Sequence, residues 1–171
     1  PEQAAINFNR EVADADVQLI SGKAREQWNN YLGRVEAEGG TDEQLRTFYS
    51  CLYRTLLFPR EFYEFDSQGN PVYYSPYDGN VHDGYMYTDN GFWDTFRAVH
   101  PLFTLLYPEV SERVTQSIIN AYNESGFMPE WASPGHRGCM IGNNSVSLLV
   151  DAWMKGIQTV DAEKALEAMI H

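Results

Sequence analysis

Two long segments without a regular hydrophobic period divide this chain of 171 residues. Residues 60–91 alternate aromatic side chains with Gly, Pro, Asp and Asn, and residues 126–144 contain four Gly and two Pro. The remainder carries apolar residues at helical spacing, which predicts the order helix, long loop, helix, helix, long loop, helix, helix. No strand pattern alternates with these helices, which argues against a parallel βαβ sheet. The expected fold class is mainly α: helical hairpins in a ring, as in an (α/α) toroid, with long irregular aromatic-rich loops on one rim.

The helical spacing places four helices near residues 42–58, 93–106, 109–124 and 145–156. Thr41 and Gln44 form a capping box that begins the first of them, and Pro59 ends it. Pro101 lacks a backbone N–H, so we expect a kink in the second helix at that point.

Two shorter features lie outside these helices. Residues 24–36 carry a helical stripe that Gly39 and Gly40 stop, and Gly22 marks a break, so this part is one interrupted helix or two short ones. Within the first long loop, Gly69-Asn70 predicts a short hairpin.

The formal net charge of −12 is spread along the whole chain. Such an acidic balance argues against nucleic acid as a partner and against attraction to anionic lipid. No apolar run approaches the length of about 18 residues that a transmembrane helix needs, and no signal peptide is visible. Because the sequence begins at Pro1 and ends inside a helical pattern at His171, we interpret it as an excised segment.

Two cysteines, Cys51 and Cys139, make no disulfide framework. Cys51 falls on a helical apolar face, where a buried thiol is expected.

The densest chemistry lies between Tyr87 and His100, where Trp93, Asp94 and Arg97 fall within five residues. In the first turn of a helix, Asp94 and Arg97 would share one face at i and i+3. A carboxylate held by an arginine beside an indole suits a sugar, because the carboxylate accepts from hydroxyls and the ring packs on C–H groups. The alternative from the residues alone is a structural ion pair beside a core tryptophan.

The second long loop is rich in side chains that could bind a ligand. Its polar and aromatic candidates are Glu130, Trp131, His136, Arg137, Asn143 and Asn144. In the first long loop, Asp78 and His82 are either ligand-facing or turn-forming residues.

Four groups of residues carry a family resemblance through their order and spacing. They are Phe48-Tyr49 with Leu52-Tyr53-Arg54; Trp93-Asp94-Thr95-Phe96-Arg97 with His100-Pro101-Leu102; Gly126-Phe127-Met128-Pro129-Glu130-Trp131; and Met140-Ile141-Gly142 with Asp151-Ala152 and Lys155-Gly156. Together they resemble glycoside hydrolase family 92, the calcium-dependent, inverting, exo-acting α-mannosidases. The resemblance covers about residues 7 to 157.

The resemblance implies a larger enzyme in which an N-terminal β-sandwich is joined by a helical linker to an (α/α)6 barrel. Residues 1–40 would be the linker segment, and residues 41–171 the first helices of an incomplete catalytic barrel. It further implies a mannose-containing glycan as substrate, N-glycan degradation, a Ca²⁺ cofactor, a periplasmic or secreted location, and the rest of the same polypeptide as partner.

Carried over by position, the resemblance assigns Trp93 and Asp94 to the subsite for the terminal mannose, with Arg97 beside them. It places Glu130, Trp131, His136, Arg137, Asn143 and Asn144 on the same rim. The family's general acid, in a Glu-Gly motif, and its base carboxylates lie downstream of residue 156, as do most calcium ligands. No catalytic pair is therefore expected here. An interpretation based on paired carboxylates alone would instead assign Asp94 and Glu130 as the acid and the base.

Two other functions remain open at this stage. The chain could be a non-catalytic carbohydrate-binding or folding fragment. It could also belong to a different helical-toroid glycosidase, which would place an acid or base within this segment.

Overall fold

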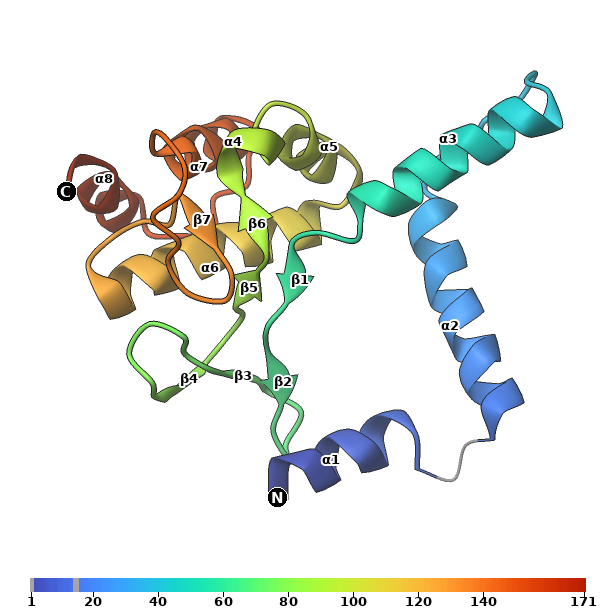
Figure 1. Cartoon of the computed structure of the whole chain (residues 1–171), viewed down its shortest axis with the longest axis horizontal. Helices are drawn as coiled ribbons and strands as arrows, with labels where there is room; N and C mark the ends of the chain where they lie inside the picture. The colour runs from blue at the N-terminus through green and yellow to red at the C-terminus, as the bar shows by residue number, and fades with distance from the viewer. Residues whose placement is uncertain (1, 14–15) are drawn as a thin grey trace.

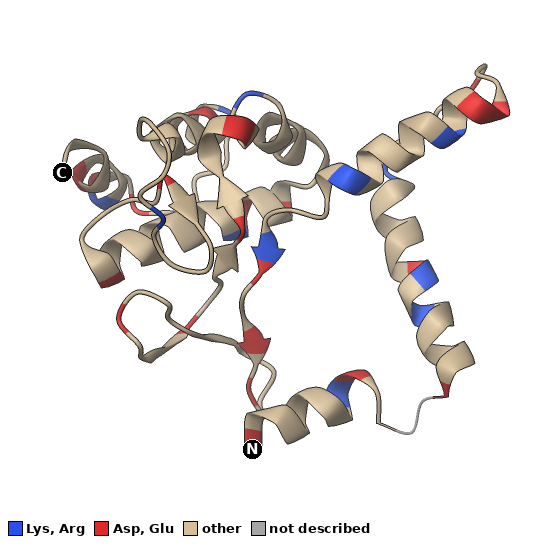
Figure 2. Cartoon of the chain, viewed as in Figure 1, with Lys and Arg blue, Asp and Glu red and all other residues tan. Residues whose placement is uncertain are grey.

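The computed structural model describes residues 2–13 and 16–171 and is mainly helical, as predicted. A body of helices and short strands is built from residue 60 onward. Of the first three helices, α1 (Glu2–Glu11) lies beside strand β2 (Glu64–Phe65) of this body, whereas α2 (Val17–Leu32) and α3 (Asp42–Thr55) lie away from it (Figure 1). Acidic and basic side chains are scattered over both parts (Figure 2). Across the described residues, no helix combines the length and hydropathy that crossing a membrane requires.

The N-terminal helices bury little of their own surface. None of the described residues of α2 is buried, and of those in α3 only Leu52 is. The C-terminal end of α2 is fastened to the body, because the Arg34 guanidinium pairs with Glu109 at 2.5 Å and the Tyr107 hydroxyl donates to the Tyr31 carbonyl at 3.0 Å. These helices therefore contact the body at their junctions and leave long faces free.

The α3 helix confirms its predicted start and corrects its end. The Gln44 N–H donates to the Thr41 hydroxyl at 3.3 Å, and the Thr41 N–H donates to the Gln44 side chain at 2.9 Å. The helix ends at Thr55, earlier than Pro59 requires. The buried thiol predicted for Cys51 is wrong, because Cys51 lies on the exposed side of α3, whereas its neighbour Leu52 is buried.

Short antiparallel strands organise the first long loop. They are β1 (Arg60–Glu61), β2 (Glu64–Phe65), β3 (Pro71–Tyr74), β4 (Val81–Asp83) and β5 (Tyr87–Thr88), paired as β1-β5 and as β2-β3-β4. The predicted hairpin is present: Phe65 opposes Pro71, and the Asp66 carboxylate accepts from the N–H groups of Gln68 and Asn70 at 2.8 Å each. Over the described residues the largest sheet has three strands, so the mainly α prediction is confirmed.

The helix expected over residues 93–106 is divided into α4 (Phe92–Thr95) and α5 (Val99–Leu106). The predicted kink at Pro101 is wrong. Pro101 lies in the first turn of α5, where a backbone N–H has no intrahelical partner and proline is tolerated. The break falls instead before Val99, where Ala98 has the non-helical angles φ −136° and ψ −49°.

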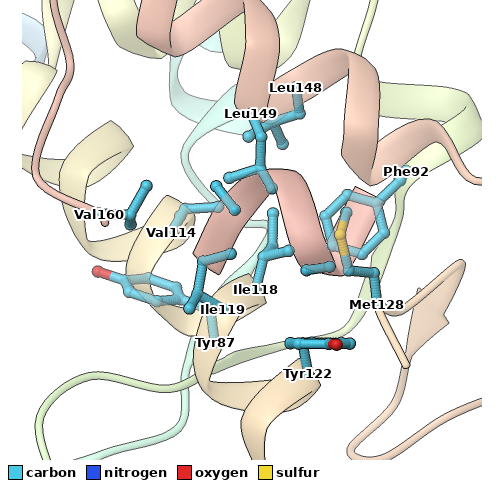
Figure 3. Packing of buried hydrophobic residues seen from close by; sticks show 12 residues of the cluster. Tyr87, Phe92, Val114, Ile118, Ile119, Tyr122, Met128, Leu148, Leu149 and Val160 are labelled. Carbon is cyan, nitrogen blue, oxygen red and sulfur yellow. The ribbon is translucent and has the colours of Figure 1, made fainter. Parts of the chain in front are cut away.

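The core lies where α6 (Pro108–Ser125) is covered by α7 (Asn144–Met154) and α8 (Ala162–Ile170). Figure 3 shows Leu148 and Leu149 facing Val114 and Ile118, with Phe92 at one side. The apolar positions of α6 recur at helical spacing and are buried except for the partly buried Val110, which confirms the helices predicted near 109–124 and 145–156. This core supports the loops that carry the candidate site.

Candidate functional site

Two stretches that are far apart in sequence meet through a pair of two-residue strands. In β6 (Asn90–Gly91) and β7 (Trp131–Ala132), Asn90 opposes Ala132 and Gly91 opposes Trp131. The Phe92 N–H adds a hydrogen bond of 3.3 Å to the Glu130 carbonyl. The joint therefore brings the start of α4 against the second long loop, and with it most of the side chains that the sequence singled out.

Asp94 lies at this joint, close to Gly91 and Trp131. A Cβ placed on Gly91 would meet the Asp94 Oδ2 at 2.7 Å and the Trp131 Cδ2 at 3.8 Å. Only glycine leaves room for the carboxylate in this position. Asp94 is exposed to solvent, so its oxygens are accessible to a ligand.

Trp93 and Arg97 are arranged differently from the prediction. Among the described residues, no ion pair joins Asp94 to Arg97, because α4 ends at Thr95 and the i, i+3 face does not continue to Arg97. The Arg97 guanidinium lies 4.3 Å from the ring centroid of Trp93 and donates to the Trp93 carbonyl at 2.7 Å. Trp93 is 45% exposed, which contradicts a core tryptophan.

A buried polar network that the sequence analysis missed supports this corner. The Asn90 Nδ2 donates to the His100 Nε2 at 3.2 Å, and the Thr95 hydroxyl donates to the Asn90 Oδ1 at 3.0 Å. His100 packs between Phe92 and Phe103, and burial lowers its pKa to about 3. No sequence signal separates such a histidine from an ordinary helical residue, because its partner lies ten positions earlier on a two-residue strand.

A groove of about 460 Å³ contains four of the predicted site residues, Glu130, His136, Arg137 and Asn143. The remaining walls come from the end of α6, from the loop and from α8: Gly126, Phe127, Met128, Gly138, Ala168 and His171. The structure thus places six of the nine predicted residues in two groups: Asp94 and Trp131 near Gly91, and the other four in this groove. Trp131 connects the groups, since it follows Glu130 directly and lies over Gly91.

His136 contacts residues of two other segments. Its Nε2 lies 2.8 Å from the Ser125 hydroxyl, and its ring packs edge-on against Tyr77 with centroids 4.7 Å apart. Burial lowers the pKa of His136, and the nearby Glu130 carboxylate opposes this change only in part. The lowered pKa favours the neutral imidazole, which offers one acceptor and one donor.

The other polar residues of the loop are used for its own shape. The Arg137 Nε donates to the Ser133 carbonyl at 2.6 Å. Asn143 accepts from the Ser145 hydroxyl at 2.5 Å. The Asn144 amide donates to the carbonyls of Ile141 and Gly142, at 3.3 Å each, and Asn144 does not line the groove.

Comparison with known proteins identifies the family. Residues 3–171 match the Glycosyl hydrolase family 92 catalytic domain. The chain belongs to this family. No curated protein matches the sequence.

Solved structures of the same family share the fold. The family GH92 α-mannosidase BT3965 from Bacteroides thetaiotaomicron, solved free and in complex with mannoimidazole, superposes with a TM-score of 0.85 at 30% identity over 97% of this chain. The GH92 family glycosyl hydrolase ccman5 gives a TM-score of 0.75 at 25% identity over 98% of this chain. The chain spans 22% of the length of the BT3965 chains and 23% of ccman5.

The family resemblance implies calcium, and one group of side chains in this segment has the spacing of metal ligands. Within the described part of the chain, Asp78, His82 and Glu124 bring their ligand atoms within 4.8 Å of one another. Calcium takes six to eight oxygen ligands, whereas this group offers two carboxylates and an imidazole. The Glu124 oxygens already accept from the Tyr73 and Ser75 hydroxyls. The group does not fit a calcium site.

Asp78 and His82 instead stabilise a turn, which was one of the two interpretations of these residues. The Asp78 carboxylate accepts from the Asn80 N–H at 2.9 Å and lies 2.9 Å from the His82 Nε2. These two contacts lower the pKa of Asp78 to about 2, the backbone bond having the larger effect.

Proposed function

We propose that this chain is the part of a family 92 α-mannosidase that forms the pocket for a terminal α-linked mannose. The observation that carries the proposal is the β6–β7 joint, which brings the Asp94 carboxylate and Trp131 to Gly91 and continues through Glu130 into the groove that contains His136. We infer mannose as the sugar because the relative BT3965 is an α-mannosidase solved in complex with mannoimidazole.

The chemistry of the side chains agrees with that substrate. An exposed carboxylate accepts hydrogen bonds from sugar hydroxyls, and such charge-assisted bonds are stronger than neutral ones. Trp93 offers a half-exposed indole, on which the C–H groups of a pyranose ring can pack. Arg97 lies on that indole and fixes its orientation, so its role is to position Trp93.

Hydrolysis itself needs residues outside this segment. An inverting glycosidase places an acid and a base roughly 6.5–9.5 Å apart on opposite sides of the bond. We assign Asp94 and Glu130 to binding and expect the acid, the base and the calcium ligands in the remaining polypeptide. In this proposal residues 1–40 form the linker, residues 41–171 begin the (α/α)6 barrel, and the enzyme acts on N-glycan mannose in the periplasm or outside the cell.

The decisive experiment assays the complete polypeptide on α-linked mannosides. We expect release of mannose, inversion at the anomeric carbon followed by proton NMR, and loss of activity with a calcium chelator that added Ca²⁺ restores. The exposed Asp42→Ala variant, far from the joint on α3, serves as the matched control for any Asp94 variant. No hydrolysis of any α-mannoside by the wild type would refute the proposal.

A further inference from the structure

The last turn of α6 holds two loops against each other beside the groove. The Glu124 carboxylate accepts from the Ser75 hydroxyl at 2.5 Å, and the Ser75 oxygen accepts from the N–H groups of Tyr77 and Asp78 at 3.0 and 3.2 Å. The neighbouring Ser125 contacts His136. Glu124 thus fixes the turn that carries Tyr77, and Ser125 fixes the histidine against which Tyr77 packs.

The two loops approach closely at the residue before His136, whose own side chain is exposed to solvent. A Cβ on Gly135 would meet the Pro76 carbonyl oxygen at 3.0 Å. The Tyr77 ring closes one side of His136 with an interplanar angle of 61°. The imidazole therefore has two contacts, the Tyr77 ring and the Ser125 hydroxyl, and the second of these bears on its tautomer.

The hydrogen bonds of Ser125 determine which tautomer is present. A hydroxyl has one proton to donate and two lone pairs. The Ser125 oxygen lies 2.6 Å from the Ala121 carbonyl and 3.1 Å from the Phe127 carbonyl, which can only accept. The hydroxyl proton is thereby committed to a carbonyl. The short contact of 2.8 Å to His136 then requires that Nε2 carries a proton and donates it to Ser125.

A neutral imidazole that is protonated at Nε2 has a bare Nδ1. Among the hydrogen bonds of the described residues, none involves this Nδ1, and His136 lines the groove. We propose that Ser125 is a positioning residue, which holds His136 in the Nε2–H form so that Nδ1 accepts a hydrogen bond from a hydroxyl of the bound sugar. This inference rests on the proposed function, which supplies the sugar.

Two isosteric substitutions in the complete enzyme distinguish the ring nitrogens. The side-chain amide of asparagine reaches the place of Nδ1, whereas that of glutamine reaches the place of Nε2. We expect His136→Asn to retain most of kcat/KM on an α-mannoside and His136→Gln to lose about fivefold to tenfold, the worth of one hydrogen bond. The reverse order would show that Nε2 contacts the sugar and would overturn the proposal.

A double-mutant cycle tests the role of Ser125. Ser125→Ala should lower kcat/KM about threefold to tenfold in the wild type and leave His136→Asn unchanged, because the asparagine does not depend on the serine. Ser125→Thr keeps the hydroxyl and should retain wild-type activity. Ser147→Ala, an exposed serine on α7, is the control. Equal losses from Ser125→Ala in both backgrounds would indicate a general structural role and contradict the inference.

The two proposals fail in different ways. A wild type that hydrolyses α-mannosides but shows an additive cycle would refute only the role of Ser125. A wild type that is inactive on every α-mannoside would refute the proposed function, and with it the sugar contact of His136.

Discussion

The Asn90 amide donates to the imidazole of His100 inside the protein, at 3.2 Å, and directly behind the corner that presents Asp94. The same Asn90 accepts from Thr95 at 3.0 Å. The end of α4 and the first turn of α5 are thus tied to one buried asparagine, which stabilises the short helix that carries the exposed Asp94 carboxylate.

The burial of His100 predicts a specific dependence of stability on pH. Its pKa is about 3 in the folded protein against 6.5 for the free side chain, so between these values the unfolded chain binds the extra proton. The contribution of neutral His100 to the free energy of unfolding is fully present above pH 6.5. It falls as the pH decreases toward 3, by up to about 1.4 kcal/mol per pH unit. His100→Gln, which keeps an acceptor for Asn90, should remove this contribution.

The measurement compares thermal unfolding midpoints of the wild type and His100→Gln from pH 3 to 8. Other titrating groups are shared, so they cancel in the difference. Two curves that stay parallel over the whole range would show that His100 does not titrate in this way.

Gly91→Ala should lower activity without unfolding the protein. The backbone φ of −93° at Gly91 suits alanine, but the new Cβ would lie 2.7 Å from the Asp94 Oδ2 and would displace it. A displacement of this size in a binding group costs on the order of tenfold or more in kcat/KM. Gly22→Ala, where a Cβ meets no atom within 4 Å, is the control. Unchanged turnover in Gly91→Ala would mean that the carboxylate position is not important.

Replacing Asp94 itself should lower kcat/KM more than replacing its neighbours does. A hydrogen bond between a charged acceptor and a hydroxyl contributes about 1.5–3 kcal/mol, so Asp94→Ala should lower kcat/KM on α-mannosides by at least about tenfold. Asp94→Asn keeps an acceptor without the charge and should fall between the wild type and alanine. The fold should survive both changes, since Asp94 is exposed. Near-normal turnover of Asp94→Ala would show that Asp94 does not belong to a pocket for mannose.

The isolated 171-residue segment should self-associate. Large apolar side chains are exposed on α3, α7 and α8, among them Phe48 (39%), Met154 (78%) and Ile170 (79%). Such patches promote aggregation when nothing covers them. Light scattering at increasing concentration should show oligomers, and Met154→Ser with Ile170→Ser should reduce them. A monomer that unfolds cooperatively would contradict the incomplete-ring interpretation.

The sequence predicted the parts of the fold that depend on local chemistry. The capping box at Thr41, the hairpin at Gly69-Asn70 and the long stripe of α6 all follow from neighbours within a few positions. The break between α4 and α5 could not be predicted, because it depends on the backbone at Ala98 and on packing around His100.

The candidate site was predicted as a set of residues but not as an arrangement. Strands of two residues have no detectable period, so the pairing of Gly91 with Trp131 left no sequence signal. Ser125 and Tyr77 were missed for the same reason, since a serine near a helix end and a tyrosine in a turn are ordinary until a histidine is placed against them.

The β6–β7 joint also sets an order of events during synthesis. Gly91 and its partner Trp131 are 40 positions apart, an interval that a ribosome translates in about 2 to 8 s at 5–20 residues per second. During that interval the nascent chain displays Phe92 and Trp93 without the strand that covers their corner. A sugar bound in the proposed pocket would not assist this early stage, because the pocket requires the second strand.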